Sequence, residues 1–109
     1  MKKEILLLGS NQEILSIFPE RKIRQFRIES KRIAVVRLED TFYAFDNHCP
    51  HQDYPLDEGN INMKKEVICP WHGYAFNLRS GNESMSRCKG LKLYPVRINE
   101  SNELVLLLS

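Results

Sequence analysis

The segment His48-Cys49-Pro50-His51, followed further along the chain by Cys69-Pro70-Trp71-His72, decides how this sequence is interpreted. The spacing is Cys-x-His, then seventeen intervening residues, then Cys-x-x-His. Each segment offers one sulfur and one nitrogen donor, and a proline beside each cysteine stiffens the backbone. Thiolate and imidazole donors hold iron–sulfur clusters, zinc or copper in proteins. Four of the six Cys and His residues fit this pattern, which predicts a metal centre formed by Cys49, His51, Cys69 and His72.

Zinc is the main alternative for this donor set. Two cysteines and two histidines suit a closed structural zinc site. Zinc fingers, however, normally pair Cys with Cys and His with His, and they lack so long an interval between the pairs. One Cys and one His in each segment instead match [2Fe–2S] centres in which two histidines replace two cysteines on one iron.

The rest of the chain is typical of a β scaffold. Helical periodicity is weak, and runs of β-branched and aromatic residues alternate with turn residues. A short helix is predicted at 10–15, where Ser10 or Asn11 caps and Glu13 follows at the capping-box position. Turns are predicted at Glu39-Asp40, 80–82 and 99–102. Strands are predicted at 22–28, 32–38, 41–45, 66–69, 74–78, 93–98 and 104–108. Many short strands separated by turns predict an all-β antiparallel sandwich or barrel.

The length of 109 residues suits one domain, so we expect a single domain over 1–109. Residues 46–81 contain all three histidines, two of the three cysteines, three of the five prolines and the only tryptophan. We therefore expect a small, loop-rich, metal-binding subdomain over about 46–81, inserted into a plainer β scaffold.

Composition excludes several classes of function. The formal net charge is +2, with 16 basic and 14 acidic residues, and no long basic run occurs, so no nucleic-acid partner is expected. The apolar runs at 5–8 and 104–108 are far shorter than the roughly 20 residues that span a membrane. No export signal is recognised, and cysteines that serve as metal ligands are typical of a reducing compartment, so a cytoplasmic protein is expected.

Beyond the four donors, the sequence resembles the Rieske [2Fe–2S] family, and most closely its small soluble ferredoxins. The resemblance extends over 41–46, 55–59, 69–81 and 91–96, and so covers nearly the whole chain. It implies a Rieske-type fold with one [2Fe–2S] cluster. By the same resemblance, Cys49 and Cys69 ligate the inner iron, and His51 and His72 ligate the outer, solvent-edge iron.

The resemblance implies an electron-transfer protein rather than an enzyme. We expect a low-potential carrier that passes single electrons from a flavoprotein reductase to a terminal oxygenase or another oxidoreductase. The alternative is a small subunit or accessory component of a larger enzyme, such as nitrite reductase. A non-redox binding domain is disfavoured because it would not need all four donors. An oxygenase is disfavoured because such enzymes add a large catalytic domain with a separate mononuclear iron site.

The chain departs from the family pattern at several positions. Respiratory Rieske proteins join their two cluster loops by a disulfide, but here the corresponding residues are Tyr54, or a near neighbour, and Trp71. In those proteins a serine and a tyrosine after the second loop bond the cluster sulfurs through their hydroxyl groups. Here the positions hold Tyr74, which is too long to copy a serine, and Phe76, which has no hydroxyl, and this predicts a low potential. The third loop, 85–90, lacks the usual prolines.

Two further side chains are assigned no part in ligation. Cys88 lies between Arg87 and Lys89, which would favour a reactive thiolate, but we expect a semi-buried loop residue. His48 breaks the ligand spacing, so we expect it to lie beside the site or at the surface. Trp71 and Tyr74 flank His72, and we expect them to shield the cluster.

Overall fold

The computed structural model describes residues 3–51, 54–71 and 73–108. Ten strands, one α-helix and one 3₁₀ turn occur in this part of the chain. In chain order they are β1 (Lys3–Leu8), α1 (Asn11–Ile17), β2 (Arg24–Ile28), β3 (Lys31–Leu38), β4 (Thr41–Asp46), η1 (Leu56–Glu58), β5 (Asn60–Ile61), β6 (Glu66–Ile68), β7 (Ala75–Asn77), β8 (Leu93–Tyr94), β9 (Val96–Ile98) and β10 (Leu104–Leu108).

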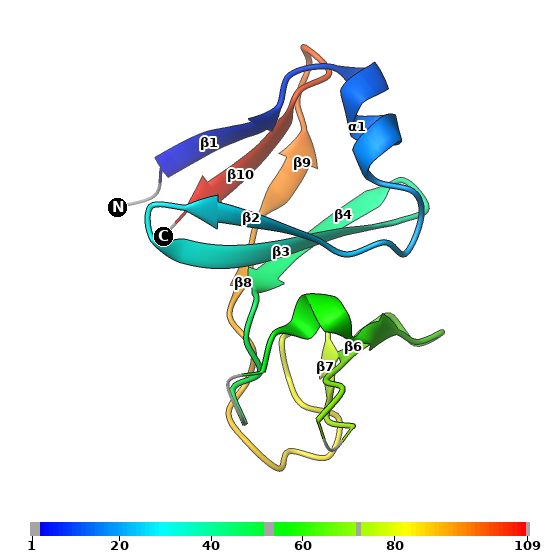
Figure 1. Cartoon of the computed structure of the whole chain (residues 1–109), viewed down its shortest axis with the longest axis vertical. Coiled ribbons are helices and arrows are strands. Elements are labelled where there is room, and N and C mark those ends of the chain that lie inside the picture. The colour runs from blue at the N-terminus through cyan, green and yellow to red at the C-terminus, as the bar shows by residue number, and fades with distance from the viewer. Residues whose placement is uncertain (1–2, 52–53, 72, 109) are drawn as a thin grey trace.

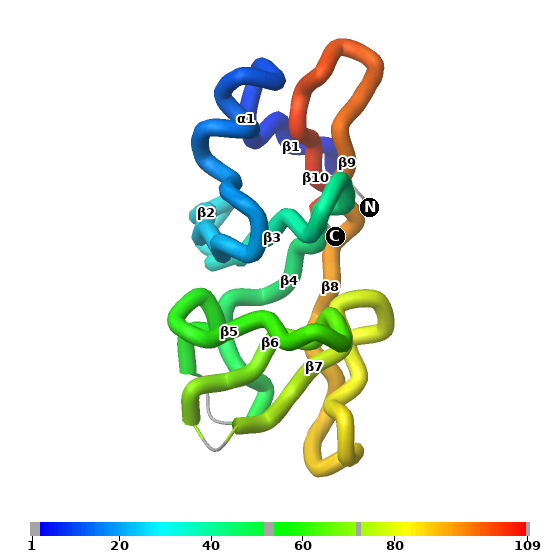
Figure 2. The backbone as a smooth tube through the Cα atoms, turned by 90° about the vertical axis from the view of Figure 1, so that its right-hand side faces the viewer, coloured from blue at the N-terminus to red at the C-terminus, as the bar shows by residue number. Residues whose placement is uncertain are grey.

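The strands form three antiparallel sheets. The outer sheet has the order β1-β10-β9, the central sheet β2-β3-β4-β8, and the small sheet β5-β6-β7. In Figure 1 the outer and central sheets lie in the upper part of the molecule and the small sheet lies below them. Figure 2 shows the loop that follows β7, coloured yellow to orange, descending beside the small sheet before the chain returns to β8. The predicted all-β antiparallel architecture is confirmed.

Strand β3 explains how the sheets are held together. Its side chains alternate between two faces, as they do in any strand. Ile33 and Val35 belong to a scaffold core shared with the outer sheet and α1. Ala34, Val36 and Leu38 belong to a second core, which contains Cys49 and Cys69 and which we call the cysteine core. Burial on both faces accounts for the unbroken apolar run in this strand.

Helix α1 closes one end of the scaffold core. The backbone N–H of Glu13 donates to Oγ of Ser10 at 3.2 Å, and Glu13 Oε1 accepts the N–H of Gly9 at 3.1 Å. This reciprocal arrangement is a variant of the capping box and satisfies donors at the start of the helix. Ile14 is buried on its inner face. The predicted helix is confirmed, with its end two residues later than expected.

Four features differ from the sequence-based expectation. The predicted strand 93–98 is two strands, because Pro95 lacks an N–H and the chain passes there from the central to the outer sheet. Strand β1 was not predicted: only its apolar run was noted, and its pairing with β10 depends on residues about a hundred positions away. The short β5 and η1 were also not predicted, since two or three residues carry no periodicity. In the part of the chain that is described, no helix has the length and apolarity needed to cross a membrane.

Candidate metal centre

The predicted sulfur donors lie on two loops at the small sheet. The first loop joins β4 to η1 and carries Cys49 and His51, and the second joins β6 to β7 and carries Cys69. Cys49 and Cys69 are 1% and 0% exposed, and their thiols lie within hydrogen-bonding range of each other. The structure thus brings both cysteines together in the cysteine core. The fourth predicted ligand, His72, lies outside the described residues.

The two loops are built alike. The backbone N–H of Cys49 donates to the carbonyl of Tyr54 at 2.8 Å, and the N–H of Cys69 donates to the carbonyl of Tyr74 at 2.8 Å. Each cysteine is therefore bonded to the tyrosine five residues later. Gly73 adopts φ +70° and donates its N–H to the Cys69 carbonyl at 3.2 Å, a left-handed conformation that glycine adopts without steric cost.

The two tyrosines connect the loops to each other. The ring of Tyr74, from the second loop, stacks on His51 of the first, with centroids 4.0 Å apart and planes 12° apart. The ring of Tyr54, from the first loop, stacks on Trp71 of the second, with centroids 6.2 Å apart and planes 11° apart. All three cysteines are free thiols. An aromatic stack between Tyr54 and Trp71, rather than a disulfide, therefore joins the two loops here.

The donors fit a soft metal centre. Burial raises the pKa of the Cys69 thiol to about 11, although the backbone N–H of Trp71 favours the thiolate. Metal binding would displace this proton, as it does at other thiolate sites. Nδ1 of His51 is buried, so the first loop also presents a nitrogen donor to the protein interior. Among the described residues, no three Cys, His, Asp or Glu side chains form a ligand set for a single ion.

The third loop is anchored by a buried carboxylate. Glu83 is 3% exposed, and its Oε1 accepts the backbone N–H groups of Met85 and Arg87 at 3.1 and 2.9 Å. The guanidinium of Arg87 bonds both carboxylate oxygens, at 3.2 and 2.6 Å. The hydrogen bond from Arg87 is the largest influence on this group and lowers the pKa of Glu83 to about 2. The loop thus has a fixed anchor without prolines.

Two residues that were assigned no ligand role lie near the centre. Burial raises the pKa of the Cys88 thiol, because desolvation outweighs the charge of Arg87. Cys88 is half-buried against the cysteine core, as expected, and is not an activated thiolate. His48 is also half-buried, with Nε2 3.7 Å from a carboxylate oxygen of Asp46. Trp71 is 48% exposed, so it covers the loops at the surface rather than within the core.

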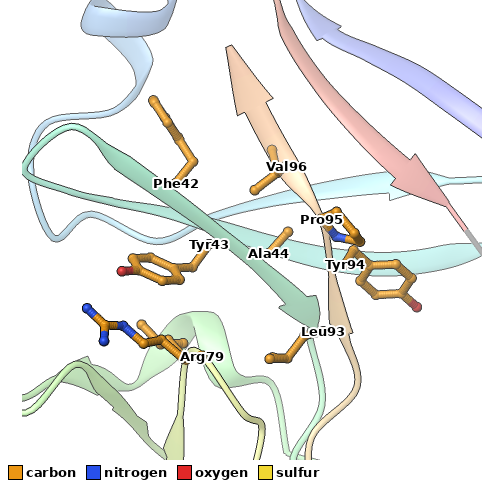
Figure 3. A pocket seen from close by; sticks show the side chains of 9 residues that line it. Phe42, Tyr43, Ala44, Arg79, Leu93, Tyr94, Pro95 and Val96 are labelled. Atoms are coloured by element: carbon orange, nitrogen blue, oxygen red, sulfur yellow. The ribbon is translucent and has the colours of Figure 1, made fainter. Parts of the chain in front are cut away.

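A separate apolar hollow lies between β4 and the strands β8 and β9. Figure 3 shows Ala44 and Leu93 inside it, Arg79 at the edge nearest the small sheet, and Val96 towards the other end. Its lining contains no cysteine, histidine or carboxylate. It offers no donor set comparable to the one between the two loops.

Sequence reasoning missed the pairing of the two tyrosines and the buried Glu83. A signal for the tyrosines is present, since Cys49 and Cys69 are each followed by tyrosine at the fifth position. No comparable signal marks Glu83, because its burial depends on how the third loop folds back.

Comparisons with known proteins agree on one family. The family model described as the Rieske [2Fe–2S] domain matches residues 11–95. Ferredoxin CarAc of Metapseudomonas resinovorans is 37% identical over 76 residues, which are 68% of this chain and 69% of that protein.

Two solved structures have a similar fold. One is described as a complex of reduced oxygenase and oxidised ferredoxin in carbazole 1,9a-dioxygenase. Its matching chain has a TM-score of 0.76 and 29% identity, over 94% of this chain and 99% of that one. The other is a putative NADH-dependent nitrite reductase small subunit from Mycobacterium tuberculosis, with a TM-score of 0.84 and 15% identity, over 100% of this chain and 97% of that one.

Proposed function

Since the chain belongs to the Rieske [2Fe–2S] family, we propose that Cys49, His51, Cys69 and His72 hold one [2Fe–2S] cluster. The protein then carries single electrons from a flavoprotein reductase to a terminal oxygenase or another oxidoreductase. The observation that carries this proposal is the pair of buried, adjacent thiols on two loops of the same construction. The proposal treats residues 1–109 as one Rieske domain in the cytoplasm, where all three cysteines remain reduced.

A bound cluster of this type accepts and releases one electron, and two neutral imidazoles in place of two thiolates make its reduction easier than in plant-type ferredoxins. The protein supplies the setting for that exchange. Cys49 and Cys69 hold the sulfur side of the site away from water. Tyr74 fixes the plane of the His51 ring by stacking on it.

A carrier that serves an oxygenase is favoured over a small subunit of nitrite reductase. The match to ferredoxin CarAc covers a similar share of both proteins. The carbazole 1,9a-dioxygenase complex contains an oxygenase with its ferredoxin. The nitrite reductase small subunit is the alternative, but at 15% identity its likeness supports the fold alone. Size-exclusion chromatography of the native complex from its source distinguishes a free carrier, which elutes alone, from a permanent subunit.

The expected potential is at the low end of the Rieske range, about −150 to 0 mV within a span of about −150 to +300 mV. Hydroxyl groups bonded to the cluster sulfurs favour the reduced state and raise the potential. Phe76 lies fully buried in the cysteine core and has no hydroxyl, while the ring of Tyr74 is stacked on His51.

Protein-film voltammetry at neutral pH, together with reduction by a nicotinamide-linked flavoprotein reductase, tests the proposal. A midpoint above about +150 mV would place the protein outside the low-potential group. Phe76→Tyr is the matched variant. It is expected to raise the midpoint by tens of millivolts, since about 1 kcal/mol of differential bonding corresponds to about 43 mV for one electron.

A further inference from the structure

The ring of Tyr74 contacts a cation as well as His51. The central guanidinium carbon of Arg87 lies over this ring, 3.8 Å from its centroid. The His51 ring lies 4.0 Å from the same centroid and nearly parallel to it. If both groups lay on the same face of the Tyr74 ring at these distances, their atoms would clash. Tyr74 is therefore sandwiched between Arg87 and His51, and the guanidinium carbon is at most 7.8 Å from the centre of the His51 ring.

The buried carboxylate of Glu83 fixes the position of Arg87. Its guanidinium bonds both oxygens of Glu83, and the same carboxylate accepts the backbone N–H of Arg87. The Glu83 side chain is fully buried and the Arg87 side chain is 35% exposed. A guanidinium is planar and permanently charged, which suits both the carboxylate and the aromatic face. The third loop thus holds one fixed positive charge against the ring that supports His51.

We propose that Arg87 tunes the reduction potential of the cluster from outside its ligands, through a positive charge held against Tyr74 by Glu83. This inference rests on the proposed function, because it requires a cluster bound at His51. When the cluster is reduced, it gains one electron from its redox partner and one unit of negative charge, and no covalent bond forms or breaks. A fixed cation nearby stabilises that added charge and favours reduction.

The size of the effect follows from Coulomb's law. We take an effective dielectric constant between the values for a near-surface pair and for water. A unit charge about 8–10 Å from the added electron then changes the reduction equilibrium by roughly three- to tenfold. A tenfold change in a one-electron equilibrium is about 59 mV, so the expected shift is about 28–59 mV.

Glu83 provides a test of sign. If Arg87 acted only by bracing the loop, removal of either partner of the ion pair would loosen the same loop and have similar consequences. A charge effect predicts opposite consequences. Arg87→Gln removes a positive charge and lowers the potential, whereas Glu83→Gln removes a negative charge and raises it.

The experiment is protein-film voltammetry of the cluster-loaded wild-type protein and four variants, with the reduced EPR spectrum of each as a second readout. Arg87→Gln is expected to make reduction three- to tenfold less favourable, and Glu83→Gln to make it more favourable. Arg87→Lys keeps the charge and is expected to stay within about twofold of wild type. Arg79→Gln is the matched control, because it removes an exposed arginine beyond the opposite end of β7 from Tyr74, and it is expected to change the potential little.

Shifts of the same sign in Arg87→Gln and Glu83→Gln would overturn the proposal, as would a shift in Arg87→Gln no larger than in Arg79→Gln. If Arg87→Gln fails to assemble a cluster, Glu83→Gln and Arg87→Lys decide, and a Glu83→Gln midpoint at or below the wild-type value overturns it. Failure of the proposed function is a different result: the wild-type protein itself then contains no acid-labile sulfide and gives no [2Fe–2S] signal.

Discussion

The scaffold core and the cysteine core lie on opposite faces of the central sheet and are held together in different ways. The scaffold core is enclosed by strands of five to eight residues and by α1. The cysteine core lies between the other face of β3 and β4 and the small sheet, whose strands have only two or three residues, and loops close the rest of it. Its first two loops are joined by two aromatic stacks, and its third loop is held by hydrogen bonds from its own backbone to Glu83.

This difference indicates that the two cores gain their stability from different sources. Long paired strands bury apolar side chains and need no cofactor for stability. A lobe with two- and three-residue strands gains stability from metal ligands, since the binding energy of a metal centre contributes to folding. We therefore expect the scaffold core to remain folded without a cofactor, and the cysteine core to depend for its stability on the proposed cluster.

The largest expected effect is loss of the cluster. Cys69→Ser or Cys49→Ser removes a buried sulfur donor, so the purified protein is expected to be colourless and free of labile sulfide. Hydrogen exchange should then be fast in β5–β7 and remain slow in the β1–β10 pair. Cys88→Ser is the matched control and should retain iron and potential. Retention of the cluster in Cys69→Ser would contradict the proposed ligand set. Equally fast exchange in both regions would contradict the expectation that only the cysteine core depends on the cluster.

The reverse experiment weakens the scaffold core alone. Phe18 is fully buried, with its ring 5.5 Å from Phe42 and 6.0 Å from Phe26. Phe18→Ala is expected to lower the free energy of unfolding by about 3–5 kcal/mol, as measured by urea denaturation. The midpoint potential of the folded fraction should remain at the wild-type value. A potential shifted as far as in Arg87→Gln would show that the two cores are not separate.

The anchor of the third loop is expected to be sensitive to acid. The pKa of Glu83 is lowered to about 2 in the folded protein, compared with about 4.3 for an unperturbed glutamate. Its contribution to stability, on the order of 2 kcal/mol, is therefore complete above the unfolded pKa and is lost as pH falls towards 2. Urea denaturation of wild type and Glu83→Gln from pH 7 to pH 3 checks this. The difference between them should shrink with acidification, and a constant difference would argue against a buried ion pair.

The aromatic stack at the surface is expected to have the smallest effect. Trp71→Ala removes the contact with Tyr54, and such ring pairs contribute about 0.5–1.5 kcal/mol. The visible absorbance of the cluster should bleach several-fold faster in mild denaturant. Met63→Ala, at a residue that is 87% exposed, is the control for loss of an exposed apolar side chain. Equal bleaching rates in the two variants would show that the stack does not hold the loops together.

The sequence predicted most of the scaffold because strand periodicity and turn residues are local signals. Strands β2, β3, β4 and β10 and the cap at Ser10 agree with their predicted positions to within two residues. The split at Pro95 and the pairing of β1 were missed, since each depends on a partner strand distant in sequence.

For the site, the spacing of Cys and His identified the two loops and the two cysteines that the structure brings together. It did not reveal the contacts that support them. The stacks of Tyr54 and Tyr74 on rings of the opposite loop form only when both loops are folded, and Glu83 is buried only because the third loop turns back over it. Arg87, considered from the sequence only as a neighbour of Cys88, bonds Glu83 and lies over the ring of Tyr74.

Pulsed EPR of the dithionite-reduced protein tests the central claim most directly, with His48→Gln as the matched control. The account predicts a [2Fe–2S] signal coupled to the nitrogens of two histidines, unchanged in His48→Gln and lost when Cys49 or Cys69 is replaced by serine. An EPR-silent protein with one zinc per chain and no labile sulfide would contradict it, and so would a cluster signal without histidine coupling.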